Sequence, residues 1–164
     1  MEHTYFPMFV DISDRKILVV GGGAIAARRV RTLLLFAAEI TVAAPDICPA
    51  MQQLLQERRV SWIRGTYEKS MLAEKDFVLA ATDNHEVNRQ VVADCRCAQQ
   101  KENRGILVNS ADDKTLCDFY FPSVVQTGDV VIGINSSGRH PENVRKARKK
   151  IETLFGKKSQ YGEE

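Results

Sequence analysis

The stretch KILVVGGGAIAARRV, residues 16–30, decides the fold class of this 164-residue chain. Lys16–Val20 is an apolar run without polar alternation, which is typical of a strand buried on both faces. Three glycines follow it directly, and residues 24–37 then have the composition of a helix. A strand, a glycine turn and a helix in this order are typical of the βαβ units that bind dinucleotides.

The glycine turn has the pattern Gly21-x-Gly23-x-x-Ala26, the variant that ends in alanine. Gly21 would permit a tight turn, Gly23 would let the main chain approach a pyrophosphate, and Ala26 would allow close contact between helix and strand. The start of the helix would offer free N–H groups and a positive dipole to the anion. The pattern therefore predicts dinucleotide binding, and the alternative is a glycine turn in an α/β protein that binds nothing.

Strands and helices continue to alternate along the chain as far as residue 109. This alternation predicts an α/β fold of the Rossmann type, in which helices cover both faces of a mainly parallel sheet. We expect strands at Glu39–Ala44 and at residues 61–64, 77–81 and 106–109, and helices at residues 49–57 and from an N-cap at Asn84 to about residue 100.

The pattern changes after Asp113. Residues 118–125 and 130–135 are β-rich runs joined by the turn signal QTGD, which predicts a hairpin appended to the sheet. Residues 141–155 have the pattern of a short, basic amphipathic helix. We therefore expect three parts, over residues 1–113, 114–140 and 141–164.

Composition excludes several classes of protein. The net charge of +2 is too small for the whole chain to read as a nucleic-acid binder, although residues 139–158 are locally basic. The four cysteines form no CxxC pair and no histidine stands at metal-ligand spacing, so we expect reduced thiols, a cytoplasmic protein and no resident metal. No apolar run approaches the ~20 residues that span a membrane, and the N-terminal sequence lacks the pattern of a signal peptide.

Polar side chains follow two of the expected strands, in AATDN at residues 80–84 and LVNSADD at residues 107–113. Ligands of open α/β sheets bind beyond the carboxyl ends of the strands. Thr82, Asp83, Asn109 and Asp112 are therefore expected to converge near a nicotinamide, and the alternative is that each one only caps a loop.

The acidic residue that usually binds the adenosine ribose is missing from the end of the second strand, which reads Ala43-Ala44-Pro45. Asp46 stands just beyond and could reach the ribose, and no arginine stands there to favour a 2′-phosphate. This arrangement favours NAD over NADP as the cofactor.

Six stretches of the chain together resemble the precorrin-2 dehydrogenase family, the NAD-dependent module of siroheme synthases, which in some members is also a sirohydrochlorin ferrochelatase. The motifs stand in the order and at the spacing of that family, across residues 6 to about 155. The stretches are GGGAIAARRV, ITVAAPD, AATDNHEVN, VNSADD, CDFYFPS and INSSGRHP.

The resemblance implies NAD-dependent oxidation of precorrin-2 to sirohydrochlorin in tetrapyrrole biosynthesis. Asp112 matches the aspartate to which the chemistry of the family is assigned, and we expect it to accept a proton while NAD⁺ accepts the hydride. The residues that match the cofactor site of the family are Gly21, Gly23, Ala24, Ile25, Pro45, Asp46, Thr82 and Asp83.

On the substrate side, Asn109 and Ser136 match residues of the family, and Arg139 and Arg145 could pair with the carboxylates on the rim of the tetrapyrrole. A solvated helix face is the alternative for the two arginines. The resemblance also implies that residues 114–140 mediate homodimerisation, and that residues 1–113 bind NAD.

The loop before the last helix departs from the pattern of the family. Ser137 stands where the family has a glycine, and His140 stands where it has a serine. His140 could ligate iron or carry a proton, and the alternative is that it only caps the turn before the helix. Whether the chain also inserts Fe²⁺ therefore stays open.

Two other functions compete with the enzyme. A regulatory domain that senses dinucleotides without catalysis shares the strand, glycine turn and helix, but has no reason to carry VNSADD or CDFYFPS. A nucleic-acid module could use the RKARKK segment, but no aromatic platform or recognition motif accompanies it.

Overall fold

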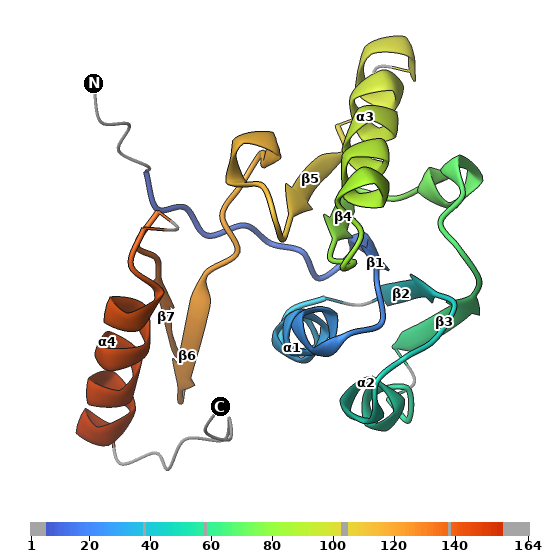
Figure 1. The fold of residues 1–164 in the computed structure, drawn as a ribbon. Helices are drawn as coiled ribbons and strands as arrows, with labels where there is room; N and C mark the ends of the chain where they lie inside the picture. Colours follow the sequence, from blue (N-terminus) through green and yellow to red (C-terminus); the bar gives the residue numbers. More distant parts are fainter. Residues whose placement is uncertain (1–5, 38, 58, 103–104, 138, 156–164) are drawn as a thin grey trace. The chain divides into compact units, whose positions relative to one another are not determined.

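The computed structural model describes residues 6–37, 39–57, 59–102, 105–137 and 139–155. Contacts among residues divide the chain into two compact units, one over residues 10–119 and the other over residues 1–9 with 120–164. Figure 1 shows the elements of both units. The division into three parts that the sequence suggested stays a prediction.

The larger unit is built on five parallel strands in the order β3-β2-β1-β4-β5. The first strand lies in the centre, and the chain adds strands first on one side of it and then on the other, as expected for the Rossmann type. The strands are β1 (Lys16–Val20), β2 (Glu39–Ala44), β3 (Val60–Arg64), β4 (Phe77–Ala80) and β5 (Leu107–Ser110).

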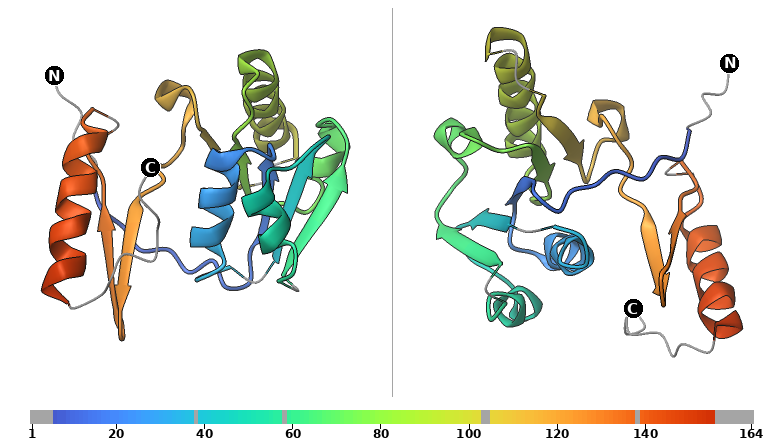
Figure 2. Two further views of the ribbon diagram at one scale, coloured as in Figure 1. Left: turned by 60° about the horizontal axis from the view of Figure 1, so that its bottom comes forward. Right: turned by 180° about the vertical axis from the view of Figure 1, so that it is seen from behind.

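Helices cover both faces of this sheet, as the sequence predicted. The helices α1 (Ala24–Leu33) and α2 (Pro49–Leu54) lie on one face, and α3 (His85–Glu102) lies on the other (Figures 1 and 2). Right-handed crossovers produce this arrangement, because the chain adds β2 and β3 on one side of β1 and then β4 and β5 on the other side. The reversal between β1 and β4 is the switch point at which such sheets bind ligands.

Burial explains the apolar run of β1. Ile17, Leu18 and Val19 are completely buried, because each face of this strand lies under a helical layer. On the α3 face, Leu18 packs in one core with Val91 and Cys95. Burial of each such aliphatic side chain contributes about 1.5–3 kcal/mol to folding.

Some element boundaries differ from the sequence predictions. The first helix was expected to reach residue 37 but ends at Leu33, because the carbonyl oxygens of Thr32 and Leu33 accept tighter 3₁₀-type bonds from Leu35 and Phe36. The N-cap at Asn84 is confirmed, since Asn84 Oδ1 accepts the N–H of Glu86 at 2.9 Å.

The strand expected at residues 118–125 is wrong for its first half. Residues 114–116 form a 3₁₀ turn, η2 (Lys114–Leu116), and strand pairing resumes only at Ser123, after Pro122, which has no N–H to donate. Asp118 instead lies beside β5: its N–H donates to the carbonyl oxygen of Val108, and its Oδ2 accepts the N–H of Val108, both at 2.8 Å.

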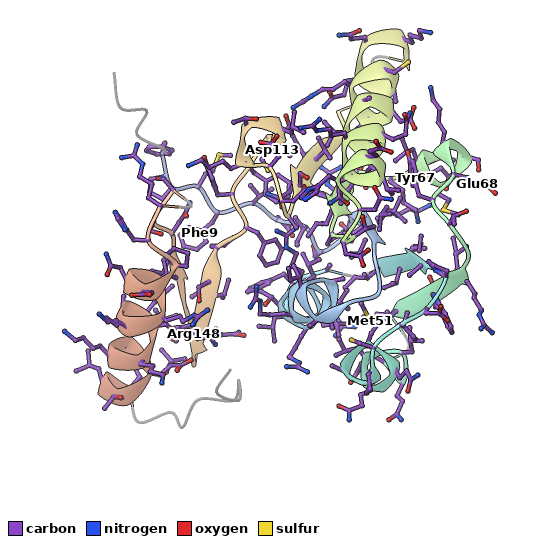
Figure 3. The ribbon with its side chains drawn as sticks, viewed as in Figure 1. Phe9, Met51, Tyr67, Glu68, Asp113 and Arg148 are labelled. Atoms are coloured by element: carbon purple, nitrogen blue, oxygen red, sulfur yellow. The ribbon has the colours of Figure 1, made fainter. Side chains whose placement is uncertain are left out.

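The smaller unit contains an antiparallel hairpin and one helix. Strands β6 (Ser123–Thr127) and β7 (Val130–Ile134) are joined by a two-residue turn in which Gly128 has a φ of 58°, as QTGD predicted. In α4 (Pro141–Leu154), Arg148 Nε donates to Glu152 Oε1 at 2.7 Å, and Figure 3 marks Arg148 on this helix.

Gly21 joins β1 to the rest of the glycine turn in a backbone conformation that other residues rarely adopt. Its φ is 123°, and a Cβ atom at this position would stand 2.3 Å from the carbonyl oxygen of Ala81. The two chain segments touch here because Gly21 N–H bonds to Ala43 on one side and Ala81 N–H bonds to Val20 on the other. Only glycine fits at this crossing point.

Gly21→Ala should lower the free energy of unfolding by about 2–4 kcal/mol, since it adds both backbone strain and a clash with main chain. Gly65→Ala is the matched control, because a Cβ atom at Gly65 meets nothing within 4 Å. It should change stability by less than about 0.5 kcal/mol. Urea unfolding of both variants measures the difference, and equal losses would contradict the role of Gly21.

Candidate functional site

The first turn of α1 is open to an anion. Gly23 is the N-cap of this helix, no side chain caps it, and no acidic residue stands in its first turn. Gly23, Ala24 and Ile25 are exposed, and a Cβ atom at Gly23 would meet nothing within 4 Å. The free N–H groups and the positive end of the helix dipole therefore lie beside accessible main chain, as a pyrophosphate requires.

The middle glycine, Gly22, was assigned no role from the sequence. A Cβ atom at Gly22 would stand 2.1 Å from the carbonyl oxygen of Asp46, and the carbonyl oxygen of Gly22 accepts the N–H of Cys48 at 2.9 Å. Gly22 thus lets the segment after β2, with Pro45 and Asp46 exposed on it, lie directly against the glycine turn. Three consecutive glycines are the feature of the sequence that could have indicated this close contact.

Asp46 has a cationic neighbour that the sequence analysis did not anticipate. Arg64, at the end of β3, has Nη2 3.8 Å from Asp46 Oδ1, and both side chains are mostly exposed. The guanidinium lies over the Trp62 ring, 5.8 Å from its centroid, and the indole N–H donates to the carbonyl oxygen of Ala44. An arginine therefore does stand beside the residue expected to bind the ribose.

The segment after β4 is organised by Asn88, a fully buried residue of α3. Its Oδ1 accepts both the N–H of Thr82, at 3.1 Å, and the hydroxyl of Thr82, at 2.8 Å, and its Nδ2 donates to the carbonyl oxygen of Thr82. Thr82 is therefore fixed from three sides, whereas Asp83 is exposed. The position of Asn88 between the apolar residues Val87 and Val91 is the feature of the sequence that could have indicated a buried polar residue.

Asp112 follows β5 and lies at the centre of a hydrogen-bond cluster. The Ser110 hydroxyl donates to its Oδ1, and His85 Nδ1 lies 2.5 Å from its Oδ2. Partial burial alone would raise the pKa of this carboxyl. The hydrogen bonds from Ser110, Asn88 and His85 outweigh that effect and lower the pKa to about 2.

The partner of Asp112 was not expected, because no motif or spacing in the sequence singles out His85. Its side chain is 78% exposed, whereas that of Asp112 is 17% exposed. Together with Asp83, Asn84 and Glu86, it lines an open depression of about 470 Å³. The structure thus brings an accessible imidazole and a covered carboxylate together at the carboxyl ends of β4 and β5.

Asn109 points into the fold. Only 3% of the residue is exposed, and its Nδ2 donates to the carbonyl oxygen of Phe119 at 2.7 Å. Among the described residues, Asn109 Oδ1 has no hydrogen-bond partner. This oxygen is itself buried, so the structure does not present the Asn109 side chain to a substrate.

The other expected substrate residues belong to the smaller unit. Ser136 Oγ accepts the N–H of His140 at 3.3 Å, at the start of α4, and Arg139 and Arg145 are exposed. Ser137, which stands where the resembling family has glycine, has a φ of 55°. The left-handed conformation that favours glycine is therefore present here in a serine.

The family model described as "Putative NAD(P)-binding" matches residues 8–123. The chain belongs to this NAD(P)-binding family. The match includes the open turn of α1, the segment after β2 and the cluster around Asp112.

Curated relatives of this member of the NAD(P)-binding family are siroheme synthases. Those of Sodalis glossinidius and Baumannia cicadellinicola are each 39% identical over 151 residues, 92% of this chain and 31% of the relative. Siroheme synthase 1 of Serratia proteamaculans is 37% identical over 151 residues. The chain spans only about a third of the length of these relatives.

A solved structure titled SirC, precorrin-2 dehydrogenase, has the same fold, with a TM-score of 0.73 and 24% sequence identity. The alignment covers 92% of this chain and 71% of that structure. This likeness confirms the α/β architecture.

The residues present fit a nicotinamide dinucleotide, because bare main chain at Gly23 and an open helix start form a cradle for a pyrophosphate. In the parts of the chain that the structure describes, no three His, Cys, Asp or Glu side chains are grouped so as to hold a metal ion. None of the described helices has an apolar run long enough to cross a lipid bilayer.

Asn88→Ala should destabilise the protein by about 2–4 kcal/mol, because it leaves polar groups of Thr82 without their buried partner. It should also raise the pKa of Asp112, from which it removes a hydrogen bond. Gln90→Ala on the same helix is the control, since Gln90 is exposed and should tolerate the change. Urea unfolding tests the first effect and carboxyl NMR titration the second, and an unchanged Asp112 titration would show that Asn88 does not support this carboxylate.

Proposed function

We propose that this chain is an NAD-dependent precorrin-2 dehydrogenase that oxidises precorrin-2 to sirohydrochlorin, acting in the cytoplasm. One arrangement carries the proposal: an anion-binding helix start after β1 and a hydrogen-bonded carboxylate after β5, at the ligand-binding edge of an NAD(P)-binding fold. The similarity to siroheme synthases over 92% of the chain supports the choice of substrate.

The residues of the larger unit divide the work between cofactor and proton. Gly21, Gly23, Ala24 and Ile25 would hold the pyrophosphate against main chain, while Thr82 and Asp83 would border the nicotinamide end. When bound, NAD⁺ supplies the hydride acceptor. The removal of the proton depends on Asp112, which the hydrogen bonds from Ser110 and His85 hold in one orientation.

The remaining roles rest on the resemblance to the family. Ser136, Arg139 and Arg145 would bind the carboxylates on the rim of the tetrapyrrole. Asn109 is the fourth residue proposed on the substrate side, and its Oδ1 is buried and has no partner among the described residues. We propose a homodimer, formed through the hairpin region. If the chain also inserts the metal, Fe²⁺ is a second substrate.

The choice of NAD rests on Asp46. A carboxylate beside the ribose binds its 2′-hydroxyl and repels a 2′-phosphate. Arg64 opposes this preference, because its guanidinium lies 3.8 Å from that carboxylate and can bind a phosphate. We therefore propose NAD as the physiological cofactor, with only a modest discrimination against NADP.

Anaerobic incubation with precorrin-2 tests the activity. The protein should produce the absorbance of sirohydrochlorin only when NAD⁺ is present, and Asp112→Asn should lower turnover by about 100-fold or more while still binding NAD⁺. Asp113→Asn is the matched control: this residue accepts the N–H of Thr115 at the start of η2, a role that asparagine can fill (Figure 3).

Two outcomes would contradict the proposal. Binding of NAD⁺ without any oxidation of precorrin-2 would favour the regulatory dinucleotide sensor, and near-normal turnover of Asp112→Asn would remove Asp112 from the mechanism. Addition of Fe²⁺ after the oxidation is complete shows separately whether siroheme forms. That last measurement does not bear on the dehydrogenase.

Exchange of the residues at the ribose end should shift cofactor preference. Asp46→Asn should lower the ratio of NAD⁺ to NADP⁺ affinity by about tenfold, because Arg64 then faces the 2′-position without a competing charge. Arg64→Gln should weaken NADP⁺ alone. Calorimetric titration measures both affinities.

Arg15→Gln provides the control for charge. Arg15 pairs with Asp76 at 3.4 Å, but at the amino ends of the strands. Its removal should leave both cofactor affinities unchanged. If Asp46→Asn and Arg64→Gln also leave both cofactor affinities unchanged, Asp46 and Arg64 do not determine the preference between NAD⁺ and NADP⁺.

A further inference from the structure

The carboxylate of Asp112 is poorly suited to accept a proton itself. Its Oδ1 already accepts a hydrogen bond from Ser110, and its Oδ2 is held by His85, both at 2.5 Å. Its pKa of about 2 makes it a weak base at neutral pH, where an effective general base has a pKa near the working pH. Its geometry instead resembles that of a carboxylate that orients a neighbouring base.

His85 has the complementary properties. Its Nδ1 faces an ionised carboxylate, which can only accept, so Nδ1 must carry a hydrogen. In the neutral ring Nε2 then has a free lone pair, and it makes no hydrogen bond to any residue that the structure describes. The side chain is 78% exposed, so Nε2 is accessible from the depression that His85 lines.

The position of the ring is fixed from two directions. His85 is the first residue of α3, and Asn84 before it caps the helix through the N–H groups of Glu86 and Val87. Asp112 reaches the ring from the loop after β5, and Asn88, one turn into α3, supports that carboxylate. Both elements end at the edge of the sheet where the cofactor is proposed to bind.

We propose that His85 Nε2 is the group that accepts the proton in the oxidation, and that Asp112 is the positioning residue that orients the imidazole. The inference rests on the proposed function and assigns to His85 the step that the sequence had assigned to Asp112. The substrate loses one hydrogen as a hydride, which reduces NAD⁺ to NADH, and one as a proton, which forms an N–H bond at Nε2. The two electrons left in the second C–H bond form the new double bond.

The charges near the ring favour this transfer. Asp112 lies against Nδ1, and Asp83 and Glu86 line the same depression, so carboxylates surround the imidazolium that forms. Arg29, on α1, interacts electrostatically with Asp112 and partly offsets them. The proton can then pass from the exposed Nε2 to water, which restores the base.

The tautomer of His85 can be measured without cofactor or substrate. Nitrogen-15 NMR of the wild-type protein should show the neutral ring with its hydrogen on Nδ1, and Asp112→Ala should shift it toward the Nε2–H form that isolated imidazoles prefer. An Nε2–H ring in the wild-type protein would overturn the inference, because Nε2 could not then accept a proton. This result does not depend on whether precorrin-2 is the substrate.

Chemical rescue tests the proton transfer itself. His85→Ala should lower turnover by about 100-fold with NAD⁺ affinity unchanged, and added imidazole should restore a substantial part of the loss. Gln90→Ala, at an exposed position of the same helix that does not line the depression, should keep normal turnover. Loss without rescue would mean a structural role, and normal turnover of His85→Ala would exclude any role.

The failures of the two proposals can be distinguished. If the wild-type protein does not oxidise precorrin-2, the proposed function is wrong, and the role of His85 in that reaction falls with it. If the wild-type protein is active and Asp112→Asn is impaired but His85→Ala is not, the proposed function stands and Asp112 acts without His85.

Discussion

The fold and the site both depend on the contact of two main-chain segments, at Gly21 and Ala81. Because no Cβ atom fits between them, the ends of β1 and β4 approach more closely than side chains would permit. That approach places the glycine turn beside the segment that carries Thr82. The cofactor cradle and the polar cluster are therefore set by backbone packing at the switch point of the sheet.

A second constraint acts through one buried amide. Asn88 is enclosed in α3, yet its carboxamide holds Thr82 and contributes to the environment of Asp112. The segments after β4 and β5 are thus tied to the same helix. A buried polar group with all its hydrogen-bond partners present is a strong restraint. If one partner is lost, the groups that remain are buried without a hydrogen bond, and their desolvation is no longer compensated.

Much of the fold could be predicted from the sequence because its signals are local. The glycine turn, the unbroken apolar run of β1 and the cap at Asn84 each act within a few residues, and the structure has all three. The strand expected at residues 118–125 begins only at Ser123, because apolar character alone does not produce strand pairing and Pro122 lacks the N–H that pairing needs.

The pairs within the site could not be predicted, because they depend on tertiary placement. Arg64 meets Asp46 only because Ala44 of β2 and Arg64 of β3 are partners in the sheet register. His85 meets Asp112 across 27 residues, through the junction of a helix start and a loop. Neither the strand register nor that junction can be predicted from the composition of the segments involved.

The association of Asp118 with β5 affects the behaviour of the sheet toward other chains. Strand β5 lies at an outer margin, where the N–H and C=O groups of Val108 and Ser110 point away from β4. Asp118 occupies those of Val108 and the Cys117 thiol those of Ser110, so this margin offers no free ladder to an incoming strand. Asp118 and Cys117 thereby protect this edge of the sheet against the addition of a strand from another chain.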